Sequence, residues 1–347
     1  MKKIILISNF HLGIFSGILK KTLKNFNIEI IENSMAGVET IHMLKSEEGK
    51  NHSVFIWMNP NIISPTFNKA LMNELIESKD ALNEIELFLD MVVECCSSYS
   101  SVILPTFHLQ NSDRHYGILE MRKNLGVRNL ILGMNRLMID KLNNHQNFIV
   151  LDSSFWFQDS DAFSSKMWYS AKVPFGNSVF NYAAKDVKAV QTAIKGNAKK
   201  LIICDLDNTL WGGVVGDVGW RNIRLGGHDH IGEAFVDFQQ KLKALHNKGI
   251  ILSICSKNTE SVAIEAIEKN PEMVLRKEDF STWKINWDDK AKNIISICEE
   301  LNLGLNSVVF IDDSVHERER VKDALPDVVV PNLPEDPRLY PSIIASM

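Results

Sequence analysis

Several features that would narrow the class of this protein are missing from its 347 residues. No apolar run approaches the roughly 20 residues that a membrane-spanning helix needs. The chain also has no block rich in lysine or arginine, and its formal net charge of −5 disfavours nucleic acid as the main partner. Neither an internal repeat nor a low-complexity segment occurs. We therefore expect no membrane span and no nucleic-acid partner.

Cysteine is scarce, and the five residues include no CxxC pair. An odd number of scattered thiols is typical of reduced cysteines in a cytoplasmic protein. The first residues, MKKIILISNF, place two lysines before an apolar run that ends at Asn9. That run is too short for the apolar region of a signal peptide, so we expect a first β-strand and a cytoplasmic location.

The composition is that of an ordinary globular protein, with 45% hydrophobic and 23% charged residues, and the length allows two domains. In the first half, short apolar runs alternate with longer amphipathic pieces such as 68–95 and 133–144. The predicted strands there are 4–8, 54–58, 101–105 and 148–152. Such alternation predicts a parallel sheet with helices on both faces.

The second half repeats this pattern. Its predicted strands are 201–205, 250–256 and 307–313, and its predicted helices lie near 232–248, 259–269 and 288–302. The polar stretch GNAKK at 196–200 places the boundary between a first domain, 1–196, and a second domain, 197–347. We predict an α/β protein of two domains, each a mostly parallel sheet with helices on both faces.

The segment LIICDLDNTLWGG, residues 201–213, carries the clearest chemical signal. Four mostly apolar residues are followed by Asp205 and Asp207, which strand alternation turns to the same face. Two adjacent carboxylates repel each other unless a cation or a proton lies between them. The pair therefore predicts either a metal site with a nucleophile or a shared-proton pair, at the strand end where open α/β sheets bind ligands.

Three later segments place further reactive side chains at strand ends or helix starts. ILSICSKN ends in Ser256, Lys257 and Asn258, whose backbone amides would open the next helix and bind an anion. NWDDKAKNI offers Lys290, with Lys292 as a competitor, and VVFIDDSVHERE ends a strongly apolar strand with Asp312 and Asp313.

These four motifs together resemble the haloacid dehalogenase-like (HAD) phosphotransferases. DLDNT matches the DxDx[TV] first motif of that superfamily, and the longer run DLDNTLWGGVVGDVG is similar to its FkbH-like branch, the HAD-IIIC group. The segment WYSAKVPFG, 168–176, also fits the FkbH-like pattern. The resemblance implies an SGNH hydrolase-like first domain of flavodoxin type, followed by a HAD-like Rossmannoid domain without a large cap.

The resemblance also implies roles for individual residues. Asp205 would be the nucleophile that forms an aspartyl phosphate and would bind Mg²⁺. Asp207 would be the general acid and then the base, and its backbone carbonyl would bind the metal. Ser256 would hydrogen-bond the phosphoryl group, and Lys290, favoured over Lys292, would neutralise its charge.

The remaining implied roles concern binding. Asp313 would be a direct metal ligand, Asp312 a ligand or a neighbour of the ligands, and Glu317 would hold a metal-bound water. The expected substrate-binding residues are Asn208, Thr209, Lys257 and Asn258.

The lengths between the motifs leave no room for a large cap. The glycine-rich run 211–227 predicts a hairpin, and only 33 positions, 257–289, separate Ser256 from Lys290. A site without a cap is open to bulky partners. Trp211 and Trp220 are candidates for the lining of its entrance, although tryptophans beside glycines also serve as packing anchors.

In the first domain, Ser8 occupies the position of the SGNH nucleophile, but the sequence there is Ile-Ser-Asn-Phe rather than the usual GDS motif. The region 152–176, where a DxxH motif would supply acid and base, contains no histidine. A serine without a base is a poor nucleophile, so we expect this domain to bind a partner or to stabilise the second domain. Residues that could assemble differently are His11, His108, Asn111 and His115.

FkbH-like proteins release phosphate from 1,3-bisphosphoglycerate and load the glyceryl group onto an acyl carrier protein, a step that needs a thiol. Cys204 and Cys255 each precede a site residue by one position, so we expect both to point into the core. We predict a Mg²⁺-dependent phosphoryl-transfer enzyme that acts on a phosphorylated small molecule, with an acyl carrier protein as a possible partner. The alternatives are an esterase acting through Ser8 and a non-catalytic adaptor for a carrier protein.

Overall fold

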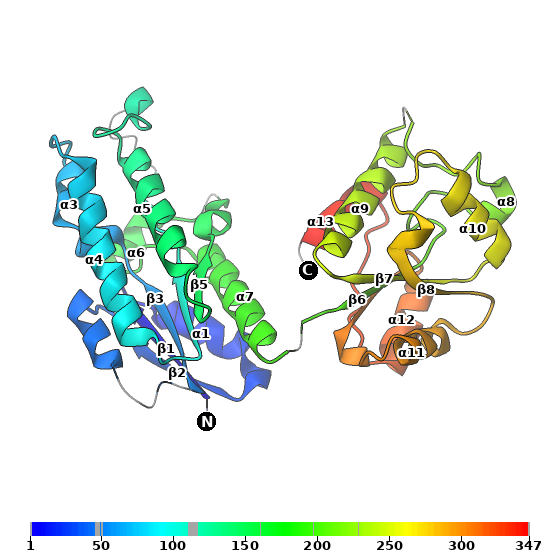
Figure 1. Cartoon of the computed structure of the whole chain (residues 1–347), viewed down its shortest axis with the longest axis horizontal. Helices are drawn as coiled ribbons and strands as arrows, with labels where there is room; N and C mark the ends of the chain where they lie inside the picture. The colour runs from blue at the N-terminus through cyan, green and yellow to red at the C-terminus, as the bar shows by residue number, and fades with distance from the viewer. Residues whose placement is uncertain are drawn as a thin grey trace. The chain divides into compact units, whose positions relative to one another are not determined.

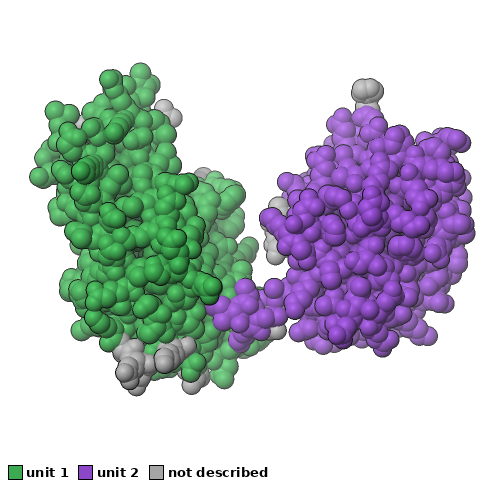
Figure 2. Space-filling view, in the orientation of Figure 1, with its two compact units in different colours: residues 1–191 green, residues 192–347 purple. Residues whose placement is uncertain are grey.

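The chain forms two compact units in a computed structural model, Met1–Gln191 and Thr192–Met347 (Figure 2). The structure describes residues 2–45, 49, 51–109, 117–159, 161–196, 198–227 and 229–345. Within these residues, no helix has both the length and the apolar character needed to cross a bilayer. The units divide a few residues before the predicted boundary between residues 196 and 197.

The first unit contains a five-stranded parallel sheet in the order β2-β1-β3-β4-β5. Its strands are β1 (Lys2–Ser8), β2 (Ile28–Asn33), β3 (Ser53–Trp57), β4 (Ser101–Pro105) and β5 (Phe148–Leu151). This is the strand order of flavodoxin-like sheets. In such sheets β2 is added on one side of β1 and the later strands on the other, so the switch point lies between β1 and β3. The apolar runs of β3 and β4 are buried throughout, as a sheet covered on both faces requires.

Helices cover both faces of this sheet (Figure 1). The helices on one face are α3 (Pro65–Leu71), α4 (Ser78–Cys96) and α5 (Val127–Leu142). Those on the other are α1 (Gly13–Thr22), α6 (Ser165–Ala171) and α7 (Asn177–Ile194). The short helix α2 (Pro60–Ile63) follows β3. Two separate apolar cores, one on each face, therefore hold the first unit together.

The second unit contains a four-stranded parallel sheet in the order β8-β7-β6-β9. Its strands are β6 (Leu201–Cys204), β7 (Ile251–Ser256), β8 (Phe280–Ile285) and β9 (Val308–Ile311). The chain adds β7 and β8 on one side of β6 and then returns to place β9 on the other side. The crevice between the carboxyl ends of β6 and β9 is therefore a switch point, where such sheets bind ligands.

Helices again lie on both faces (Figure 1). One face is covered by α9 (His230–Asn247), α10 (Glu260–Lys269) and α13 (Tyr340–Ala345), and the other by α11 (Lys290–Glu300) and α12 (Val315–Ala324). Residues 257–289 hold α10, a 3₁₀ turn and β8, with no inserted domain. The predicted fold class, two α/β domains without a large cap, is confirmed.

Three local predictions need correction. The segment 68–95 is two helices, because Asn73, at φ 59°, turns the chain after α3. The glycine-rich run after Asp205 is not a regular hairpin. Gly212 and Arg224 form one antiparallel bridge, which closes a loop around the single turn α8 (Val215–Val218). Strands β2 and β8 were not predicted.

Candidate active site

The loop after β6 places the first group of site residues. Leu201–Cys204 are buried, and the ladder to β9 continues through the Asp205 amide, which donates to the Ile311 carbonyl at 2.9 Å. Asn208 has a left-handed φ of 54°, which asparagine tolerates better than most residues. Its side-chain Oδ1 accepts from the Gly213 amide at 2.8 Å. The exposed Asn208 therefore shapes the loop itself.

Three carboxylates converge at the switch point. Asp205, Asp312 and Asp313 each place one oxygen within 4.8 Å of the others. Asp205 is 7% exposed and Asp312 is fully buried. The Oδ1 atom of Asp205 is buried and has no hydrogen-bond partner. An orphaned oxygen among three oxygen donors suits a hard divalent cation, so the residues present fit Mg²⁺.

Lys290 lies between two of these carboxylates. Its Nζ is 3.0 Å from Asp205 Oδ2 and 2.6 Å from Asp312 Oδ2, and the residue is 2% exposed. Asp289 caps helix α11 by accepting from the Lys292 amide, which fixes Lys290 as the first helical residue. Burial alone would lower the pKa of Lys290, but the two carboxylates raise it. The competitor Lys292 is exposed on the same helix.

The electrostatics of the cluster favour bound protons or a bound cation. Burial raises the pKa of Asp312 to about 6, and repulsion from Asp205 adds to this, while Lys290 opposes it. The pKa of Asp313 is also raised, first by burial and then by Asp205. Thr209 is fully buried, and its hydroxyl accepts from the Asp313 amide at 3.2 Å. It therefore ties the loops after β6 and β9 together.

Asp207 is oriented by three donors. Its Oδ1 accepts from the Trp211 indole at 2.9 Å and from the Val215 amide at 3.0 Å, and its Oδ2 accepts from Asn258 Nδ2 at 2.8 Å. Burial and the charge of Asp205 raise the pKa of Asp207, against the effect of these donors. The carboxylate of Asp207 is thus held away from the three-carboxylate cluster and biased toward carrying a proton.

Trp211 does not line an entrance, as one reading of the sequence had suggested. It is fully buried, because its indole fills the core beneath the loop while its N–H reaches Asp207. Trp220 is half-buried and packs against the same core. Asn258, expected to bind substrate, instead holds Asp207 and is buried.

The other predicted residues lie at the same edge of the sheet. Ser256 is buried at the end of β7. Lys257 follows it and forms an ion pair with Glu317 at 2.7 Å. Glu317 was expected to hold a metal-bound water. In the structure the Glu317 carboxylate pairs with the Lys257 ammonium. Helix α12 begins directly after the loop that holds Asp313, and its first turn places Glu317 beside Lys257.

Two residues that contact this edge were not predicted from the sequence. The Arg318 Nη1 atom donates to the backbone carbonyls of Asp312 and Asp313, at 2.8 and 2.6 Å. Tyr340 Oη donates to the Asn208 carbonyl at 3.3 Å. Arg318 directly follows Glu317, so its closeness to the aspartates was visible in the sequence. Tyr340 comes from the distant end of the chain, where no motif pointed to it.

A cavity of about 610 Å³ adjoins the cluster. Asn208, Asp313 and Arg318 line it, together with residues of the loop between Gly212 and Arg224. Leu333, Pro334 and Tyr340 complete its apolar part. Of the three converging carboxylates, that of Asp313 therefore borders this open space.

The prediction that Cys204 and Cys255 are buried is confirmed. All five cysteines are buried and none forms a disulfide. Burial raises the pKa of the Cys255 thiol to about 12 and also raises that of Cys204. Neither thiol is positioned as a nucleophile beside Asp205.

The first unit offers little support for an esterase. Ser8 is fully buried, and its hydroxyl accepts from the Phe10 amide at 3.1 Å. His11 is exposed, whereas His108 stacks on Phe157 with the ring centres 3.9 Å apart. Burial lowers the pKa of His108 to about 4. Asn111 and His115, the other candidates, lie outside the described residues.

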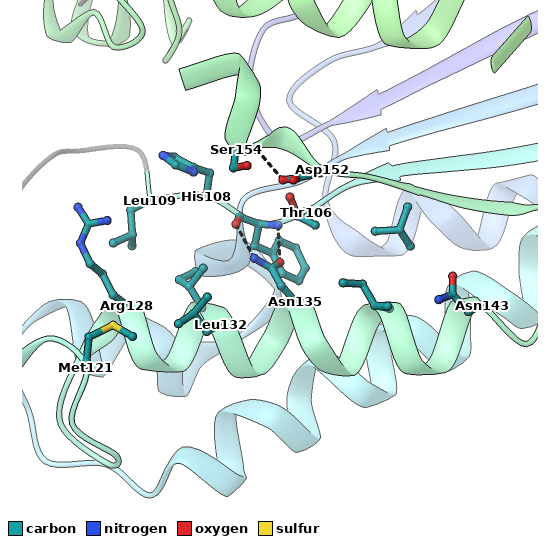
Figure 3. Close-up of a pocket in the computed structure, with 14 residues that line it drawn as sticks. Thr106, His108, Leu109, Met121, Arg128, Leu132, Asn135, Asn143, Asp152 and Ser154 are labelled. Atoms are coloured by element: carbon teal, nitrogen blue, oxygen red, sulfur yellow. Dashed lines mark hydrogen bonds between the residues drawn. The ribbon is translucent and has the colours of Figure 1, made fainter. Parts of the chain in front are cut away.

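The first unit also has a cavity, of about 670 Å³, beside α5 at the carboxyl ends of β4 and β5 (Figure 3). The Asn135 side chain fixes the Phe107 backbone in one wall of the cavity. Its Oδ1 accepts from the Phe107 amide at 2.6 Å, and its Nδ2 donates to the Phe107 carbonyl at 2.9 Å. Asp152 accepts from the Ser154 amide at 3.0 Å. The rest of the lining is largely apolar, and Ser8 is not among the described residues that form it.

The chain matches no protein-family model and no curated protein. Solved structures do resemble it. The N-terminal part of protein BF1531 from Bacteroides fragilis, described as containing a phosphatase domain complexed with Mg, is 29% identical, with a TM-score of 0.88. That likeness covers 99% of this chain and 93% of the other, so it extends through both units.

Two further matches cover 43% of this chain each. One is a HAD-superfamily hydrolase of subfamily IA from Geobacter sulfurreducens, at 16% identity, TM-score 0.29 and 100% of that chain. The other is 3-deoxy-D-manno-octulosonate 8-phosphate phosphatase from Moraxella catarrhalis, at 22% identity, TM-score 0.25 and 78% of that chain. Of these three, the structure from Bacteroides fragilis is the one whose fold matches this chain over both units.

Proposed function

We propose that the chain is a Mg²⁺-dependent phosphatase of the HAD type that acts on a phosphorylated small molecule. Two observations on Asp205 carry this proposal: its Oδ1 is buried without a hydrogen-bond partner, and one of its carboxylate oxygens lies within 4.8 Å of oxygens from Asp312 and Asp313. The Mg complex of the structural neighbour from Bacteroides fragilis supports the choice of cation.

In this proposal Asp205 attacks the phosphorus atom, and an aspartyl phosphate forms as the bond to the leaving oxygen breaks. Asp207 donates its proton to that oxygen, for which its raised pKa suits it, and then accepts a proton from the attacking water. Water attack breaks the phosphorus bond to Asp205 and releases inorganic phosphate. Lys290 compensates the charge around the nucleophile.

Mg²⁺ would be held by Asp205, Asp313 and Asp312, with the backbone carbonyl of Asp207 as a further predicted ligand. When bound, it would screen the carboxylates from one another and neutralise phosphoryl oxygens. Ser256, the last residue of β7, and Lys257, which follows it, would contact the phosphoryl group. Thr209 and Asn208 support the loop that carries Asp207.

At a finer level, we also propose that the chain belongs to the FkbH-like group. Four motifs in the expected order support it, and the flavodoxin-type strand order of the first unit agrees with an SGNH-like domain. Loading of an acyl group onto an acyl carrier protein would need an accessible thiol. The cysteines of this chain are buried, so the carrier would have to supply that thiol.

The test is phosphate release from a panel of acyl phosphates and sugar phosphates, with Mg²⁺ or with EDTA. Asp205→Asn should abolish release, while Asp217→Asn, at an exposed aspartate of α8, should leave it unchanged. Ser8→Ala should also leave it unchanged. Release that survives Asp205→Asn would overturn the proposal, and hydrolysis of an ester that disappears in Ser8→Ala would favour the esterase.

A further inference from the structure

Arg318 is a buried cation that contacts the backbone of the carboxylate cluster. It lies on α12, is 5% exposed, and donates from Nη1 to the carbonyl oxygens of Asp312 and Asp313. One guanidinium nitrogen therefore bridges two consecutive peptide units. Those two units carry two of the three converging carboxylates.

Arg318 is also buried without an ion pair. The ion pairs found among the described residues include none for this side chain, and its Nε is buried without a hydrogen-bond partner. Burying an unpaired charge is strongly unfavourable unless nearby dipoles or charges compensate it. Here the recorded compensation comes from the two backbone carbonyls.

The loop that Arg318 holds is fully buried at Asp312 and partly exposed at Asp313. The 610 Å³ cavity borders both Asp313 and Arg318. Thr209 and Lys290 hold the two carboxylates: the Thr209 hydroxyl lies 3.4 Å from Asp313 Oδ1, and Lys290 Nζ donates to Asp312 Oδ2 at 2.6 Å. The amides of the loop donate to Thr209 Oγ1 and to Asp312 Oδ1. The carbonyls of Asp312 and Asp313 accept from Arg318, so the carbonyl side of the loop depends on this side chain.

We propose that Arg318 is a positioning residue that sets the affinity of the site for Mg²⁺. By fixing the two carbonyls, it keeps the carboxylates of Asp312 and Asp313 turned toward Asp205 in the absence of the ion. The site then binds the cation without first ordering the loop. This inference depends on the proposed function, in which these carboxylates hold Mg²⁺.

The experiment measures binding of MgCl₂ to the full chain by titration calorimetry, for the wild type, Arg318→Met and Arg318→Lys. Loss of a group that orients metal ligands commonly weakens metal affinity by about 10- to 100-fold, and we expect a weakening in that range for Arg318→Met. Arg318→Lys keeps the charge with a shorter reach, so its affinity should fall about three- to tenfold. Lys322→Met, on the same helix, is the matched control and should bind Mg²⁺ like the wild type.

A second readout separates positioning from a general structural defect. The Mg²⁺ concentration that gives half-maximal phosphate release should rise by the same factor as the dissociation constant. The rate at saturating Mg²⁺ should change less than about threefold, because the bound ion then orders the loop itself.

The possible outcomes are distinct. Unchanged Mg²⁺ affinity in folded Arg318→Met overturns the inference about Arg318. If that variant does not fold, Arg318→Lys decides in its place, and wild-type affinity in Arg318→Lys overturns the inference. A wild-type chain that binds no Mg²⁺ overturns the proposed function instead, before any variant is compared.

Discussion

Replacing Lys290 by methionine tests whether this lysine keeps the carboxylates together. Its ammonium lies 3.0 Å from Asp205 and 2.6 Å from Asp312, at 2% exposure. Methionine has a similar length and helix propensity, so the change removes mainly the charge. Two buried carboxylates would then face each other without the lysine between them.

The expected loss of stability follows from this geometry. Removing one partner of a buried ion pair usually destabilises a protein by about 3–5 kcal/mol, because an uncompensated charge stays behind. We expect a loss in that range for the metal-free second unit at about pH 8, well above the pKa of about 6 of Asp312. The loss should shrink at about pH 5, because the pKa of Asp312 is already about 6 and rises further without Lys290.

The assay is urea unfolding in EDTA at the two pH values, followed by circular dichroism. Lys292→Met is the matched control, since Lys292 is exposed on the same helix and should change stability by less than about 0.5 kcal/mol. Equal unfolding free energies for Lys290→Met and wild type at the higher pH would refute the reasoning. So would a loss that does not depend on pH.

Two further predictions follow, one from the raised pKa of Asp312 and one from the burial of the cysteines. Because the pKa of Asp312 is raised from its ordinary 3.8 to about 6, this group stabilises the metal-free fold below the lower value. That contribution is lost as the pH rises through about 6, so the thermal midpoint of the wild type in EDTA, measured relative to that of Asp312→Asn, should fall between about pH 4 and about pH 7. Saturating Mg²⁺ should remove this relative fall, and a relative midpoint that responds to pH equally with and without Mg²⁺ would contradict the prediction. The five cysteines should react with a thiol reagent only after unfolding, because all are buried and the pKa of Cys255 is about 12. The reacted thiols are counted by absorbance. One thiol that reacts rapidly in the folded chain would show that burial is incomplete.

The part of the site that the sequence predicted follows from one geometric rule. Asp205, Ser256 and Asp312 each end an apolar strand of a parallel sheet, and the carboxyl ends of parallel strands share one edge. Their convergence could therefore be expected without coordinates. Lys290 was chosen over Lys292 by resemblance alone, and the helix that begins at Lys290 explains why only the former reaches the cluster.

The strands that were missed lie at sheet edges. β2, with the sequence IEIIEN, and β8, with the sequence FSTWKI, mix polar residues with apolar ones. Each pairs with a neighbour on one side, so neither needs the continuous apolar run that marks a central strand. The other two edge strands, β5 and β9, were predicted because their sequences FIVL and VVFI are continuously apolar.

Residues that support the site were harder to predict, because their roles depend on partners distant in the sequence. Trp211 was a candidate for the entrance lining or for a packing anchor, and its indole is buried and holds Asp207. Glu317 was expected to hold a metal-bound water, and the structure shows its ion pair with Lys257. In both cases the residue type was informative, while the partner came only from the fold.

The charges around the cluster also bear on the two alternatives that the sequence left open, a cation or a shared proton. Four carboxylates, of Asp205, Asp207, Asp312 and Asp313, face two buried cations, Lys290 and Arg318, which leaves a formal charge of −2. One proton would halve this charge, whereas one divalent ion would cancel it. The raised pKa of Asp207 and of Asp312 shows that protons are drawn to the site. A proton on Asp207, which already accepts hydrogen bonds at both oxygens, would still leave Oδ1 of Asp205 without a partner. A cation beside that oxygen satisfies both the charge and the orphaned atom, so the arrangement favours a divalent ion over a shared proton at this cluster.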